Sequence, residues 1–173
     1  TGVAEAARAS LRRIIEHTRG HCRDFAEREG TLTMLKDLAS AAQTCDQEEV
    51  ASYVSEAIKG IEEQDVVRHA ELHGILGAAS SNVEIASTMR EAMQWHWDDI
   101  STEALAAFQE KIATADSMSA VEATSEICVI LDLANTHHLG AVAELATEAL
   151  STHLLSAAAH KDGPWLLTMA RNA

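Results

Sequence analysis

The stretch Ser117-Met-Ser-Ala-Val-Glu-Ala-Thr-Ser-Glu-Ile-Cys-Val-Ile-Leu-Asp-Leu-Ala-Asn135 indicates the fold class. Its apolar residues recur every three or four positions, which is the period of a helix with one buried face. We therefore predict a long helix over residues 117–135. The predicted buried face consists of Ala123, Val129, Ile130, Leu133 and Ala134.

The composition extends this helical prediction to the whole chain. The 173 residues are 47% hydrophobic but only 3% aromatic, and they include 8 Gly and 1 Pro. A β-sandwich or barrel needs more turn residues and more β-branched or aromatic strand residues than this. We predict an all-α antiparallel bundle of about six to eight helices, in one domain over residues 1–160 with a short tail helix at 161–173. The helices are expected at about 3–29, 32–43, 46–60, 64–79, 82–97, from 101, 117–135 and 139–160, with Asp46 and Asn82 as N-caps.

Net charge and cysteine usage limit the partners and the compartment. The formal charge of -14 argues against nucleic-acid binding by this segment and against an anionic membrane surface. No apolar run approaches the roughly 18 residues of a membrane span. Cys22, Cys45 and Cys128 are far apart and form no CxxC motif, so a disulfide framework is not expected. These features predict a cytoplasmic protein.

Two histidines stand on the apolar face of the helix expected at 64–79. His69 and His73 are spaced i,i+4, so their rings lie on one face and can reach one metal ion. Two histidines at the edge of the core, bonded to carbonyl groups, would give the same pattern. The other such pair, His17 and His21, is expected at the surface.

Two later helices also place polar side chains on apolar faces. Glu126 stands at the centre of the face predicted for residues 117–135, with Glu122 one turn earlier, and His153 stands on the face of the last long helix. A buried carboxylate needs an arginine, a metal or a subunit interface, and His153 alone also fits a core histidine. One shared divalent metal, bound by His69, His73, Glu126 and His153, would explain all three helices. Imidazole with a carboxylate suits Zn²⁺, Ni²⁺ or Fe²⁺.

The segment from His69 to Asn82 resembles part of the FCD domain, the C-terminal effector-binding domain of FadR-subfamily GntR transcriptional regulators. The similarity lies in Leu72-His73, Leu76, Ala78-Ala79-Ser80 and Asn82, with weaker similarity at Val129-Ile130, from Ala146 to His153-Leu154, and in the first helix. The resemblance implies an all-α bundle with a central divalent metal, a small carboxylate effector beside it, and a homodimer that moves DNA-binding heads. This chain contains no winged helix-turn-helix, so such a head would lie outside it, on the N-terminal side.

The resemblance also assigns residues by position. It makes His73 and His153 metal ligands, and His69 stands where the family has Asp. The family's middle His has no counterpart, and Glu126 or Glu122 falls near its place. An arginine is expected to hold the effector carboxylate, and we assign Arg8 to this role with Glu122 beside the ligand.

Three classes of function follow from these residues. The first is a ligand-sensing regulatory domain that binds a small carboxylate next to a divalent metal. The second is a metal-carboxylate helical-bundle enzyme or oxygen-binding protein, for which Glu122 is the evident base. The third is a metal-free helical interaction module. No nucleophile motif, phosphate loop or dinucleotide fingerprint is present, so no catalytic residue is assigned and an enzyme is not expected.

Overall fold

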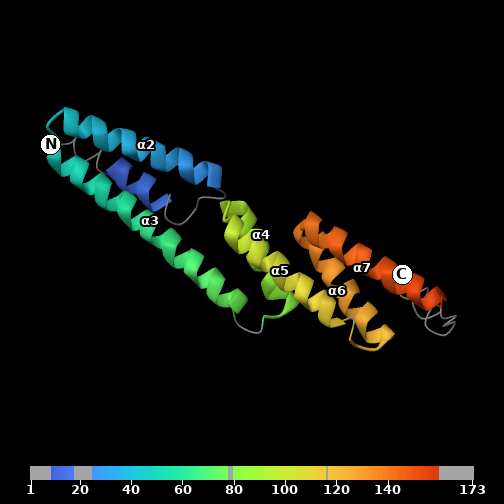
Figure 1. Cartoon of the computed structure of the whole chain (residues 1–173). Coiled ribbons are helices and arrows are strands. Elements are labelled where there is room, and N and C mark those ends of the chain that lie inside the picture. The colour runs from blue at the N-terminus through green and yellow to red at the C-terminus, as the bar shows by residue number, and fades with distance from the viewer. Residues whose placement is uncertain (1–8, 18–24, 78–79, 116, 160–173) are drawn as a thin grey trace. The chain divides into compact units, whose positions relative to one another are not determined.

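A computed structural model describes residues 9–17, 25–77, 80–115 and 117–159 (Figure 1). Within these residues the regular structure is entirely helical, which confirms the all-α prediction. Residues 9–17 are helical and precede six labelled helices. These are α2 (Phe25–Thr44), α3 (Glu48–Gly77), α4 (Asn82–Trp95), α5 (Asp98–Ala115), α6 (Ala120–His137) and α7 (Gly140–Ala159). The predicted tail helix at 161–173 lies outside the described residues.

The described residues group into two compact units, and each has its own core. The first unit extends to Glu71 and also includes Gln94–His96. Figure 1 shows α2 and α3 running antiparallel, with the helical segment 9–17 beside them. Their apolar faces bury Leu11, Ile15, Leu32, Leu35, Ala39, Val54, Ala57 and Ile61.

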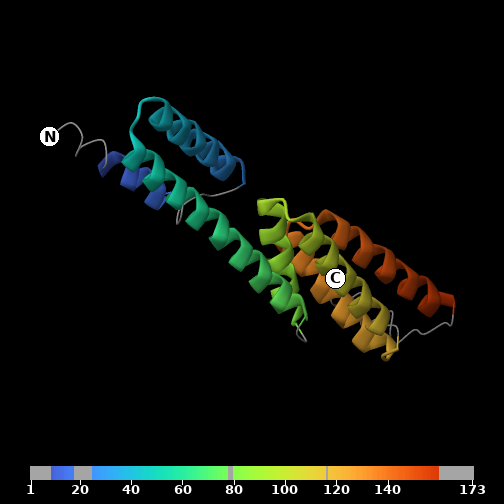
Figure 2. The same ribbon diagram turned by 60° about the vertical axis from the view of Figure 1, so that its left-hand side comes forward.

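The second unit comprises Leu72–Met93 and the residues from Trp97 onward. It contains α4, α5, α6 and α7, of which α6 and α7 form an antiparallel hairpin (Figure 2). Phe108 is fully buried at the centre of its core. The C-terminal turns of α3 add Leu72, which packs with Ala92 and Ile100.

Three of the predicted helix boundaries are wrong. α2 continues through Gly30, where a helix end was predicted, and α3 continues through Gly60 and joins two predicted helices into one of 30 residues. Glycine in a helix interior costs only about 0.5–1 kcal/mol, which burial of the flanking apolar residues offsets. α5 begins at Asp98 rather than at Ser101, so it gains an acidic first turn.

The helix caps also differ from the prediction. Ser81 caps α4, because its backbone N–H donates to Glu84 Oε2 at 2.8 Å and its hydroxyl accepts from the Glu84 N–H. Asn82 is therefore the first residue of α4 and not its cap. Asp46 has a left-handed backbone (φ 53°) and ends α2, with the Gln47 N–H donating to the Ala42 carbonyl.

A buried arginine ties α2 to α3 within the first unit. Arg28 is only 6% exposed. Its Nη2 donates to the Ile61 carbonyl at 2.8 Å, and its Nε donates to Asp65 Oδ2 at 2.8 Å. The guanidinium also lies 5.5 Å from the ring centroid of Trp95. Desolvation raises the pKa of Asp65, and the hydrogen bond and charge of Arg28 oppose that rise.

Candidate metal site

The imidazole of His73 lies between two carboxylates in the second unit. His73 is on the last turns of α3, and Asp99 and Glu103 are one turn apart at the start of α5. Nδ1 of His73 lies 2.5 Å from Glu103 Oε2, and Nε2 lies 3.2 Å from Asp99 Oδ2. Both ring nitrogens therefore face a carboxylate oxygen supplied by the same neighbouring helix.

The three side chains are accessible to solvent. His73 is 39% exposed, Glu103 43% and Asp99 58%. An ion from solution can reach them without an opening of the core. Exposure also keeps the dielectric high, so the pairs by themselves contribute little to stability.

The carboxylates favour the protonated form of the ring. The hydrogen bond to Asp99 raises the pKa of His73, the bond to Glu103 adds to the rise, and desolvation opposes it. In the absence of metal, the group is therefore suited to an imidazolium held by two anions. A metal ion must displace one of its protons before it can bind.

The geometry at Nε2 fits two ligands of one metal ion. With metal–ligand bonds of about 2.0–2.2 Å, two adjacent ligand atoms lie about 3.0–3.5 Å apart in octahedral or tetrahedral coordination. The 3.2 Å between His73 Nε2 and Asp99 Oδ2 falls in this range. Nδ1–H of His73 would then donate a hydrogen bond to Glu103 Oε2, which orients the ring and raises the basicity of Nε2.

His69 lies one turn before His73 on the continuous helix α3. Both side chains are half-buried, and their ligand atoms are within 4.8 Å of one another. This spacing follows from the i,i+4 positions on the helix. The i,i+4 spacing in the sequence thus places the ligand atoms of these two histidines close together on α3.

The other two predicted metal ligands are not in this group. Glu126 is half-buried on α6, where Oε1 accepts from Asn82 Nδ2 at 2.6 Å. His153 is half-buried on α7. Among the described residues, the candidate metal-ligand group contains His69 and His73 but neither Glu126 nor His153.

The two residues predicted to hold an effector are placed differently. Arg8 lies outside the described residues. Glu122 is exposed and belongs to the capping box of α6, where its Oε2 accepts from the Ser119 hydroxyl at 2.6 Å and from the Ser119 N–H at 3.2 Å. These two bonds lower the pKa of Glu122. The Glu122 carboxylate caps the helix, and a Glu three residues after a Ser cap is the usual position for this role.

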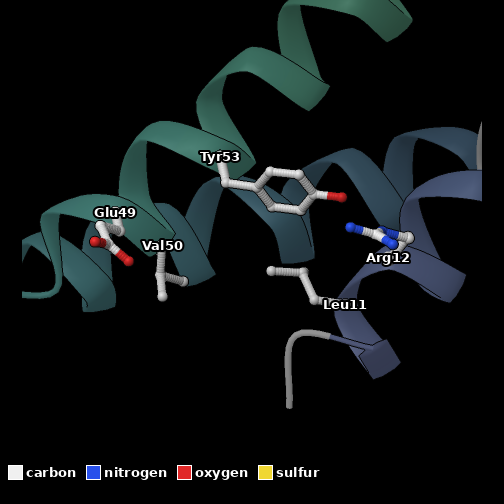
Figure 3. A pocket seen from close by; sticks show the side chains of 5 residues that line it. All are labelled: Leu11, Arg12, Glu49, Val50 and Tyr53. Atoms are coloured by element: carbon white, nitrogen blue, oxygen red, sulfur yellow. The ribbon is translucent and has the colours of Figure 1, made fainter. Parts of the chain in front are cut away.

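Another arginine lines a hollow of about 250 Å³ in the first unit. Figure 3 shows the Arg12 guanidinium and the Tyr53 hydroxyl directed towards each other, beside Leu11, with Val50 and Glu49 further along the hollow. A guanidinium and a phenol next to apolar side chains can bind a carboxylate. This hollow contains no residue of the histidine site, so Arg12 does not take the role predicted for Arg8 beside the metal.

Sequence reasoning missed Asp99 and Glu103. The predicted helix began at Ser101, which left Asp99 in a connector and hid its i,i+4 relation to Glu103. The acidic pair Asp98-Asp99 was the available signal, because acidic residues are favoured in the first turn of a helix.

No protein-family model, curated protein or solved structure matches this chain. The resemblance to FCD domains therefore stays a prediction. In the described parts of the chain, no helix is both long enough and apolar enough to cross a membrane.

Proposed function

We propose that this chain is a metal-responsive regulatory module, and that its second unit binds one divalent transition metal at His73. The observation that supports this proposal is the arrangement around the His73 ring, with Asp99 beside Nε2 and Glu103 at Nδ1. His73 and Asp99 would be ligands, and Glu103 would orient the imidazole. This donor set suits Zn²⁺, and also Ni²⁺ or Fe²⁺.

Metal binding would change how α3 and α5 are held together in the second unit. In the metal-free form, the two carboxylates bind a protonated ring. In the metal-bound form, the same side chains share an ion that favours one arrangement of the two helices. A ligand that binds one arrangement better than another shifts the population towards it, which is how a sensor reports its ligand.

The wider function expected from the sequence is part of the same proposal. The chain would act as a homodimeric ligand-sensing domain in transcription regulation. Its effector would be a small carboxylate. The metal would hold the helices together and would also bind this effector. A metal-free interaction module is the second candidate, because His73 as an imidazolium between Asp99 and Glu103 is also a stable arrangement without metal.

Calorimetric titration of Zn²⁺ into untagged, chelator-treated protein at pH 7.5 tests the proposal. We expect about one equivalent to bind, loss of this binding in His73→Ala, and a 10–100-fold weaker affinity in Glu103→Gln, in which the ring loses its charged partner. His17→Ala is the matched control, since His17 also faces a carboxylate, that of Glu27 at 3.7 Å. Absence of binding, or equal binding by wild type and His73→Ala, would favour the metal-free module.

A further inference from the structure

The second unit contains a hollow of about 390 Å³ that is separate from the histidine site. The C-terminal end of α3, Ser80, and helices α4, α5 and α6 contribute to its wall. A volume of this size lies within the range of small-molecule sites. Its aliphatic wall includes Leu76, Ile85 and Ala107.

The lining combines both signs of charge with apolar surface. Glu110 and Glu126 supply carboxylates, and Lys111, which is half-buried, supplies an ammonium group. Ser80 and Thr114 add hydroxyl groups. The remaining lining is aliphatic, apart from the thioether of Met118. Such a lining suits a ligand that carries a positive group, a negative group and an apolar portion.

Glu126 is held in this hollow by an amide. Asn82 Nδ2 donates to Glu126 Oε1 at 2.6 Å, so the carboxylate is positioned rather than free to rotate. The Asn82 Oδ1 atom is buried and has no hydrogen-bond partner among the described residues. Asn82 does not line the hollow, so its amide positions Glu126 and does not contact a ligand there. A ligand ammonium group in the hollow would donate to the Glu126 carboxylate.

We propose that this hollow binds a small zwitterion, an α-amino acid with an apolar side chain. Its ammonium group would bind at Glu126, its carboxylate at Lys111, and its side chain against the aliphatic lining. The proposal does not depend on the metal, because no residue of the histidine site lines this hollow.

Titration of L-leucine into the full chain, followed by calorimetry and by amide NMR shifts, tests the proposal. We expect saturable binding, with shifts in α5 and α6. L-leucinamide, which lacks the carboxylate, and N-acetyl-L-leucine, which lacks the ammonium group, should each bind at least about tenfold more weakly, as expected for loss of one charged hydrogen bond. These analogues need no variant, so the result does not depend on the folding of a mutant.

Two substitutions locate the site. Glu126→Gln and Lys111→Met should each weaken L-leucine binding about tenfold or more, whereas Glu148→Gln, an exposed change of the same charge on α7, should leave it unaltered. Circular dichroism checks the folding of each variant. Lack of saturable binding up to about 10 mM, equal affinity for L-leucine and L-leucinamide, or full affinity in both folded site variants would overturn the proposal. The L-leucine and zinc titrations test different sites, so either proposal can be refuted while the other stands.

Discussion

Replacement of Arg28 by methionine should destabilise the first unit by about 3 kcal/mol. The substitution keeps most of the buried aliphatic stem, but it removes the hydrogen bonds to Asp65 and to the Ile61 carbonyl, and the contact with Trp95. Hydrogen bonds to charged groups contribute about 1.5–3 kcal/mol, and a cation–π contact contributes about 0.5–1 kcal/mol. The side chain of Asp65 is 34% exposed and can regain water, which keeps the loss at the lower end of the 3–5 kcal/mol seen for broken buried pairs.

Urea unfolding followed by circular dichroism at 222 nm measures this loss. Arg68→Met is the matched control, because Arg68 pairs with Glu71 at 2.9 Å on the surface of the same helix that carries Asp65. An exposed pair of this kind contributes about 0–1 kcal/mol. A double-mutant cycle with Asp65→Asn should give a coupling above about 1 kcal/mol. If Arg28→Met costs no more than Arg68→Met, the assignment of Arg28 as a stabilising tie between α2 and α3 is refuted.

Three further predictions concern the second unit. Phe108→Ala should cost about 3–5 kcal/mol in urea unfolding, because the ring is fully buried, and a loss below about 1 kcal/mol would contradict its place in the core. Ser119→Ala should lower the free energy of unfolding by about 1 kcal/mol through loss of the α6 cap. In an NMR titration of this variant, the pKa of Glu122 should return towards its ordinary value. An unchanged pKa would refute the capping box. In the absence of metal, the raised pKa of His73 stabilises the folded state below about pH 6.5. This stabilisation is lost as the pH rises through the pKa of His73 in the folded state. The Tm of the wild type should therefore fall more over this range than the Tm of His73→Ala. Parallel Tm curves for the two proteins would show that the carboxylates do not bind the imidazolium.

The all-α class follows from the sequence because helical periodicity and composition agree along the whole chain. The helix ends do not follow so directly. Gly30 and Gly60 are typical of helix ends, yet both lie inside helices, because the local cost of a glycine is small beside the burial of Leu32 and Ile61. Tertiary packing outweighs a local conformational preference of this size. The packing cannot be read from the residue type at a single position.

The sequence predicted part of the candidate site. The i,i+4 rule identified His69 and His73, because a regular helix fixes that relation. It could not identify Asp99 and Glu103, since their approach to His73 depends on how α5 packs against α3. The helical-wheel placement of Val129 was wrong, since this residue is 47% exposed, and Glu126 accordingly lies at the edge of the buried face. A small error in the angle of a helical face is enough to move a polar residue from the core to a rim.

The most direct test of the metal proposal is a crystal structure of the zinc-soaked protein with anomalous diffraction at the zinc edge. We expect an anomalous peak about 2.0–2.2 Å from both His73 Nε2 and Asp99 Oδ2, with Glu103 still bonded to Nδ1. A cysteine-bound ion would instead lie about 2.3 Å from sulfur, and Cys45 and Cys128 are both exposed. Zinc found only at these cysteines, or a His73 ring that binds both carboxylates with no peak beside it, would contradict the proposal.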